Sequence, residues 1–297
     1  MTRKPGPARR SLAEAAASSV LRQMKIDGLW VDPEAIAASK DIVVKAKPDT
    51  ASGVSGMLIK AGDNFGIMYA THIPSRGFQR FSISHELGHY CIEGHPEALL
   101  ATGVHQSHAG FVSGDPFEQE ADYFAAALLM PELPFKKAIA DHDPGLACVE
   151  SLCKACETSL TATAIRYSAL TSDGIAVLST TGDEIDWCFM SDGIKQAKGL
   201  SWPRKGTPVP AGTVTARFNG DPDNVTSGRR ESDEGRLNDW LGGDRIYRVT
   251  EEVVGLGQYG RTLTILTCKN LSLRAEADET EDDEDALIES WTPRFRR

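Results

Sequence analysis

The sequence has few cysteines, a shortage of basic residues and no long hydrophobic run. Six cysteines among 297 residues are too few for a disulfide framework, so we expect a reducing compartment. No segment reaches the roughly 18 consecutive apolar residues that a membrane-spanning helix needs, so we expect no membrane partner. Lys and Arg number 32 against 42 Asp and Glu, which gives a net charge of −10. This balance argues against direct nucleic-acid binding, because phosphate contacts require a basic surface.

The remaining composition is that of a soluble globular protein. Hydrophobic residues make up 41% and charged residues 25%, which excludes wholesale disorder. Basic residues near the N-terminus are not followed by an apolar core, because 11–17 is mostly alanine and serine and contains Glu14. That segment predicts the start of an amphipathic helix and not a signal peptide, so we expect a cytoplasmic protein.

The first half of the chain is expected to combine helices with a small antiparallel sheet. Apolar residues recur at helical spacing over 11–25, and Asp32-Pro33 supplies the cap and first turn of a second helix. Apolar runs separated by turn residues predict strands at 42–44, 57–59 and 65–69. We expect further helices at about 81–92, from Asp115-Pro116 to Pro131 and within 132–171, with a loop over 95–114.

From residue 174 the pattern changes to β-strands. Strand-like runs separated by Gly, Pro and Asp occur at 175–179, 185–190, 214–218, 246–249 and 263–267. The tail contains the run Glu276–Asp285, which has eight acids and no bases and predicts disorder. We therefore expect an α+β chain with a flexible lead (1–10), a first domain (11–145), a helical linker (146–172), a β-rich domain (173–275) and an acidic tail (276–297).

One motif carries metal chemistry. His85-Glu86-Leu-Gly-His89 has the pattern H-E-x-x-H. On a helix, residues i and i+4 share a face, so the two imidazoles can bind one metal ion. Glu86 then lies beside the metal, where its carboxylate can take a proton from water. The alternative, two ordinary surface histidines, is weakened by the helix that follows.

A catalytic zinc site needs a third protein ligand, and the helix after Asp115 offers one. Glu118 and Asp122 lie one turn apart on a stripe that continues as Ala and Leu and therefore faces the core. We predict Glu118 as the ligand and Asp122 as acceptor for the N–H of a ligating histidine. Glu118 could instead complete a capping box with Asp115. Glu120 is the rival ligand, but it projects roughly 200° away from Glu118.

The segments R-F-S-I-S-H-E-L-G-H-Y and E-x-E-A-D-x-F-A-A-x-L-L-M-P, in this order, resemble the ImmA/IrrE family of zinc metallopeptidases. The resemblance implies a gluzincin-like core, made of a small sheet, the HExxH helix and a glutamate helix. It implies zinc bound by His85, His89 and Glu118, with Glu86 as the base. Manganese or another divalent ion is the alternative, because such ligands accept several. Many family members have Asn at the position of Asp122.

For substrate binding and for stabilisation of the oxyanion, the sequence predicts only groups of candidate residues. A peptide substrate is expected to pair with an edge strand just before the zinc helix. That strand comprises Phe65, Gly66, Ile67, Met68 and Tyr69. The groups considered for stabilising an oxyanion are His72, His105, His108 and Tyr123. His95, His105 and His108 could shape the active-site cleft, but their default interpretation is that of solvated loop histidines.

The β-rich half resembles the GAF-like C-terminal domain of the longer, IrrE-like family members. The resemblance depends on the strand pattern and on the segments Lys205-Gly-Thr-Pro-Val-Pro and Tyr259-Gly-Arg-Thr-Leu-Thr-Ile-Leu. It implies a regulatory or sensor domain with a small-molecule effector. The stretch 148–171 has the position of a helix-turn-helix-like linker in those members, but its few basic residues argue against DNA reading.

Together these observations predict a cytoplasmic zinc endopeptidase of narrow specificity. The resemblance implies that the substrate is a helix-turn-helix (XRE-type) transcriptional repressor, whose cleavage switches genes on. One alternative is a non-catalytic, antitoxin-like regulatory binding protein with a structural or silent zinc site, although a structural site would not need Glu86. Another is a ligand sensor whose main activity lies in the β-rich domain.

Overall fold

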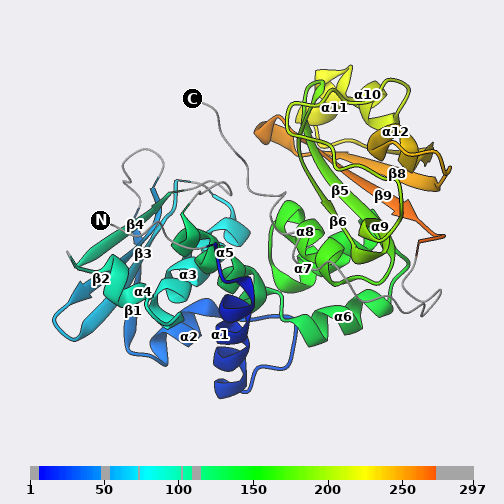
Figure 1. Ribbon diagram of the computed structural model, residues 1–297. Helices are drawn as coiled ribbons and strands as arrows, with labels where there is room; N and C mark the ends of the chain where they lie inside the picture. Colours follow the sequence, from blue (N-terminus) through cyan, green and yellow to red (C-terminus); the bar gives the residue numbers. More distant parts are fainter. Residues whose placement is uncertain (1–6, 48–53, 73, 102, 109–114, 272–297) are drawn as a thin grey trace, which may run out of the picture.

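The computed structural model describes residues 7–47, 54–72, 74–101, 103–108 and 115–271. Two sheets are joined by a group of helices (Figure 1). The first part of the chain contains α1 (Arg10–Gln23), α2 (Pro33–Ala38), β1 (Ile42–Lys47), β2 (Val54–Ala61), β3 (Asn64–Ala70), α3 (Arg76–Cys91), α4 (His95–Leu99), β4 (Val104–His108) and α5 (Pro116–Leu129). The predicted acidic tail lies outside the described residues.

The first sheet is mixed and has the strand order β1-β3-β2-β4. The expected antiparallel sheet is therefore wrong at β1, which pairs with β3 in parallel. The substrate strand predicted at Phe65–Tyr69 is also wrong as an edge, because β3 pairs with β1 on one side and with β2 on the other. β4 is an edge strand instead, and its sequence Val-His-Gln-Ser-His is polar, as exposed edges commonly are. Neither β4 nor α4 was expected in the predicted loop 95–114.

Helices α1, α3 and α5 pack together with the first sheet. Their shared core includes Leu58 and Ile67 from the sheet and Leu87, Phe124 and Leu128 from the helices. α3 begins five residues earlier than predicted, at Arg76, because the Ser75 hydroxyl accepts a hydrogen bond from the backbone N–H of Phe78 at 3.4 Å. The predicted Asp32 cap of α2 is confirmed.

The second part of the chain surrounds an antiparallel sheet with the order β6-β5-β9-β8-β7. Its elements are α6 (Glu132–Ala140), α7 (Leu146–Cys156), α8 (Leu160–Leu170), β5 (Gly174–Thr181), β6 (Glu184–Met190), α9 (Asp192–Lys195), α10 (Val214–Asn219), α11 (Pro222–Thr226), β7 (Arg230–Arg236), α12 (Leu237–Leu241), β8 (Arg248–Gly255), a 3₁₀ turn (Gly257–Tyr259) and β9 (Thr262–Cys268). The strand predicted at 214–218 is wrong. It is helix α10, whose first turn is capped by Thr213.

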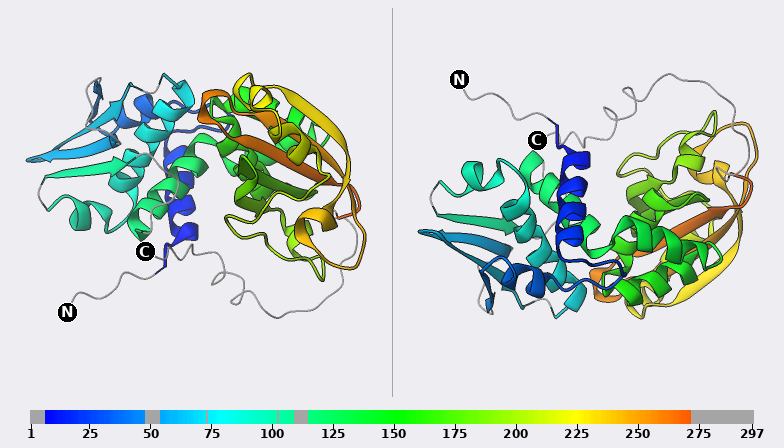
Figure 2. Two further views of the ribbon diagram at one scale, coloured as in Figure 1. Left: turned by 90° about the horizontal axis from the view of Figure 1, so that it is seen from above. Right: turned by 90° about the horizontal axis from the view of Figure 1, so that it is seen from below.

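Helices α6, α7 and α8 belong to the core of the second sheet. Phe135, Val149 and Tyr167 from these helices share one buried cluster with Val177 and Ile265 from the sheet. The sequence predicted a change from helices to strands near residue 172, and the buried residues of these preceding helices cluster with the second sheet. In Figure 1, α7 and α8 lie between the two sheets, and Figure 2 shows the molecule from above and from below.

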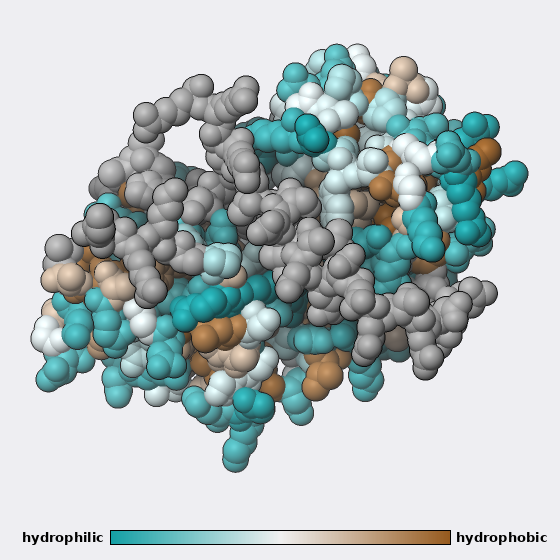
Figure 3. Space-filling model, viewed as in Figure 1, coloured by the Kyte–Doolittle hydropathy of each residue, from teal (hydrophilic) through white to brown (hydrophobic). Residues whose placement is uncertain are grey.

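Among the described residues, no helix has the length and apolar character needed to cross a membrane. On the face shown in Figure 3, hydrophobic residues form small patches separated by hydrophilic ones.

Candidate metal centre

Helix α3 carries two histidines and a glutamate deep in the first half of the molecule. His85 and His89 are one turn apart and point the same way, with exposed fractions of 7% and 0%. α3 crosses α5 closely because residue 88 is a glycine. A Cβ at that position would lie 3.1 Å from Cα of Ala121 and 3.2 Å from Cβ of Phe124. The small residue thus brings the glutamate helix within reach of both imidazoles.

Helix α5 presents Glu118 to these histidines. Asp115 caps the helix by accepting the backbone N–H of Phe117 at 3.0 Å, and Pro116 occupies the first turn. Glu118 lies in the first turn of the helix. Its carboxylate oxygens lie 3.3 Å from Nε2 of His85 and 3.4 Å from Nε2 of His89. The ligand atoms of His85, His89 and Glu118 all lie within 4.8 Å of one another.

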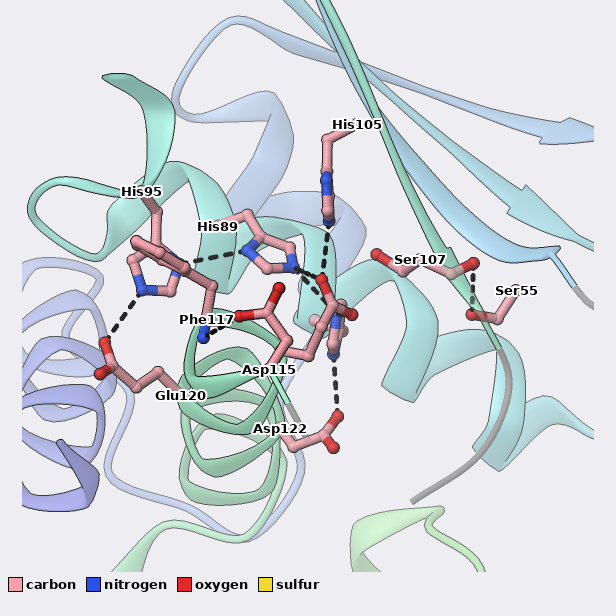
Figure 4. A network of polar contacts seen from close by, with 11 residues as sticks. Ser55, His89, His95, His105, Ser107, Asp115, Phe117, Glu120 and Asp122 are labelled. Carbon is pink, nitrogen blue, oxygen red and sulfur yellow. Dashed lines mark hydrogen bonds and ion pairs between the residues drawn. The ribbon is translucent and has the colours of Figure 1, made fainter. Parts of the chain in front are cut away.

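The outer nitrogen of each imidazole is already engaged. Nδ1 of His85 lies 2.9 Å from a carboxylate oxygen of Asp122, the contact that the sequence predicted. Nδ1 of His89 lies 3.1 Å from Nδ1 of His95 (Figure 4). If each Nδ1 donates a proton, both Nε2 atoms present lone pairs to the same point, and they are only 3.0 Å apart. Two lone pairs and a carboxylate repel one another unless a cation lies between them. Two His and one Glu are a donor set that zinc accepts, so the residues fit a divalent metal.

The charges of the centre agree with a cation site. In the absence of metal, burial would lower the pKa of His85, but hydrogen bonds with Asp122 and Glu118 raise it to about 10. Burial lowers the pKa of His89 to about 3. Burial also acts to raise the pKa of Glu118, but hydrogen bonds from His105, His85 and His89 keep it far below its ordinary value. The pocket therefore favours one positive charge beside Glu118, and a metal ion supplies that charge when it replaces a proton.

Glu86 is fully buried next to this cluster. Neither of its carboxylate oxygens has a hydrogen-bond partner among the described residues. Burial raises the pKa of Glu86 to about 7, although the neighbouring His85 opposes the shift. A carboxylate with a pKa near neutrality can both accept and return a proton, which is the property of a general base.

His95, Glu120 and Arg9 extend the cluster and were not predicted from the sequence. His95 was expected in a solvated loop, but it is fully buried at the start of α4. Its Nε2 lies 3.0 Å from Oε2 of Glu120. Glu120, the rival ligand, makes no contact with His85 or His89 and instead accepts three hydrogen bonds from Arg9. No local signal in the sequence could have joined residues 9, 95 and 120.

The groups considered for the oxyanion are spread over several elements. His105 extends from β4 towards the centre, and its Nε2 lies 2.9 Å from Oε1 of Glu118 (Figure 4). Tyr123 packs under the guanidinium of Arg10, 5.5 Å from its ring centroid. His72 is exposed just after β3. His108 is the last residue of β4, and its side chain is not among those that the structure describes.

Comparisons with known proteins agree with the geometry. Residues 37–166 match the family model of the IrrE N-terminal-like domain, Peptidase_M78. This part of the chain therefore belongs to the IrrE N-terminal-like family, as the motif resemblance implied. Among solved structures, a Mycobacterium tuberculosis transcriptional regulator is similar in fold, with a TM-score of 0.55 and 16% sequence identity over 88% of this chain and 76% of that chain. A search of curated proteins found no significant match.

Proposed function

We propose that this chain is a zinc-dependent endopeptidase of narrow specificity. One observation carries the proposal: the unpartnered, buried carboxylate of Glu86 lies beside three converging metal ligands. A site that only stabilised the fold would not require an unpaired buried carboxylate, which costs free energy. The membership of residues 37–166 in a peptidase family supports the same conclusion.

The residues of the metal centre are proposed to have distinct roles in peptide hydrolysis. Zinc bound by His85, His89 and Glu118 would supply a Lewis acid and lower the pKa of water towards about 7. Glu86 takes the proton of the attacking water on its carboxylate and delivers it to the leaving amine. His105 is the group best placed to donate a hydrogen bond to the developing oxyanion, because its ring already points at Glu118 from 2.9 Å.

The substrate peptide is proposed to bind in extended form along β4. Among the strands that the structure describes, β4 is an edge of the first sheet and pairs with β2. An added strand would pair along its outer edge. His105 lies within this strand, so the scissile bond of a peptide bound there would pass close to the metal ligands.

The biological substrate is proposed to be a helix-turn-helix transcriptional repressor in the cytoplasm, as the family resemblance implies. The second half of the chain is proposed to act as a GAF-like regulatory domain with a small-molecule effector. Its antiparallel sheet with helices on both faces supports this assignment.

Metal content and cleavage test the proposal together. Mass spectrometry of protein purified without added metal should find about one zinc per chain in the wild type and in Glu86→Gln, but little in Glu118→Ala. Labelling of new protein N-termini in cells should then reveal one or a few cleaved proteins with the wild type and none with Glu86→Gln. Zinc without any Glu86-dependent cleavage would instead favour a non-catalytic, antitoxin-like binding protein.

A further inference from the structure

A hydrogen-bonded chain of four side chains links the N-terminal end of α1 to His89, one of the proposed metal ligands. It runs from Arg9 through Glu120 and His95 to His89. Arg9 precedes the first residue of α1 and lies outside the segment that matches the family model. Its contact with Glu120 spans 111 positions of the sequence.

In the hydrogen bonds between Arg9 and Glu120, it is clear which residue is the donor. A guanidinium only donates hydrogen bonds. Its Nη2 donates to Oε2 of Glu120 at 2.8 Å, and its Nε and backbone N–H donate to Oε1 at 3.0 and 2.9 Å. Glu120 is therefore a carboxylate that accepts on both oxygens, although its side chain is only 4% exposed. The remaining contact, with His95, must also be a hydrogen bond that Glu120 accepts.

The hydrogen bond that Glu120 accepts from His95 in turn determines which nitrogen of His89 carries the proton. Because Nε2 of His95 donates to Glu120 at 3.0 Å, Nδ1 of the neutral His95 ring is left as an acceptor. Nδ1 of His89 lies 3.1 Å from this acceptor and must carry the proton. Nε2 of His89 therefore presents a lone pair to the metal site. His95 is fully buried, and the ring of Phe117 packs against it with the two ring centroids 4.9 Å apart.

We propose that Arg9 is a positioning residue for the metal, which acts through Glu120 and His95 to fix the tautomer and orientation of His89. This inference rests on the proposed function only in taking His85, His89 and Glu118 as the zinc ligands. Outer partners of a ligating histidine typically contribute 10- to 100-fold to metal affinity. The N-terminal segment thereby becomes part of the metal site, although it lies far from that site in sequence.

The experiment compares zinc affinity in full-length variants, by competition with a chromogenic chelator. Arg9→Ala and Glu120→Gln should each weaken zinc binding by about 10-fold or more, and the double variant should be no worse than the weaker single one, because both break the same chain. Arg9→Lys should restore part of the loss. Arg10→Ala is the matched control, because half-exposed Arg10 pairs with Glu14 and lies on the Tyr123 ring, away from Glu120, and it should bind zinc within about twofold of wild type.

A second measurement separates positioning from loss of folding. Long-range ¹H–¹⁵N NMR of the metal-free protein should show the Nδ1–H tautomer of His89 in the wild type and in Arg10→Ala, and a mixture of tautomers in Arg9→Ala. Wild-type zinc affinity in Arg9→Ala, or an unchanged His89 tautomer, would overturn the inference and leave the proposed function intact. Failure of the wild type itself to bind zinc would overturn both.

Discussion

The side chain of Glu86 packs directly against Gly56, in space that the Cβ of any other residue at position 56 would fill. A Cβ at position 56 would collide with Oε1 of Glu86 and would lie 3.1 Å from both Cγ and Cδ. Gly56 lies in β2 directly after an irregularity in its pairing with β4, at Val54. Such bulges commonly redirect side chains next to active sites. The sheet thus accommodates the buried carboxylate of Glu86 by omitting a side chain.

Adding one methyl group at this position should displace the base without removing the metal. We expect Gly56→Ala to retain about one zinc per chain and to lose at least 10-fold in kcat, because overpacking would shift Glu86. Gly66→Ala is the control, since a Cβ there would meet only the backbone oxygen of Val43 at 3.5 Å. Equal activity of the two variants would contradict the proposed dependence of Glu86 on Gly56.

The buried carboxylate should make stability depend on pH. Burial raises the pKa of Glu86 in the folded protein to about 7, above its ordinary value of 4.5. Folding therefore favours its protonated form, and stability is lost as the pH rises from about 4.5 to about 7. In metal-free protein, Glu86→Gln should be more stable than wild type by on the order of 2 kcal/mol at pH 8 and equal to it near pH 4.5. Urea unfolding with a chelator present measures this, and a pH-independent difference would contradict it.

We expect the role of Asp122 to depend on its hydrogen-bond acceptor and not on its charge. Its Oδ1 faces Nδ1 of His85 at 2.9 Å, and an asparagine oxygen can replace it. We expect Asp122→Asn to bind zinc within about threefold of wild type and Asp122→Leu to bind it about 10- to 100-fold more weakly. Chelator competition distinguishes them. If Asp122→Asn were as weak as Asp122→Leu, charge would be the relevant property.

Replacement of His105 should affect catalysis more than metal binding. His105→Phe removes the donor on β4 but none of the three proposed ligands. We expect a loss of about 10²- to 10³-fold in kcat on an identified substrate, with zinc content unchanged. His142→Phe is the control, because His142 is exposed and contacts the backbone oxygen of Ala138. Loss of zinc from His105→Phe would mean that His105 serves to hold Glu118.

The parts of the site that lie on helices could be predicted from sequence. The i, i+4 spacing places His85 beside His89, and the same periodicity places Glu118 one turn from Asp122. His95 and Arg9 could not be found, because their contacts join segments with no common period. Partners in a sheet are equally non-local, so β3 was assigned to an edge that β4 occupies.

Errors in the second half have a similar origin. The run 214–218 contains two β-branched residues and was assigned to a strand, but burial of Val214 and Phe218 on one face, together with the Thr213 cap, favours a helix. β7 was missed because its residues Arg-Glu-Ser-Asp-Glu-Gly-Arg lack the hydrophobic alternation of a strand. As an edge strand with only β8 beside it, β7 tolerates this composition.

The packing of α6, α7 and α8 determines where a recombinant fragment of the second half should begin. A recombinant fragment that starts at residue 173 would lack the helices that cover Val177, Ile265 and their neighbours. These hydrophobic side chains would then be exposed to solvent. Such a fragment would aggregate, whatever ligand its sheet binds. A fragment that starts at Met130 keeps these helices and is the version in which to screen for effectors.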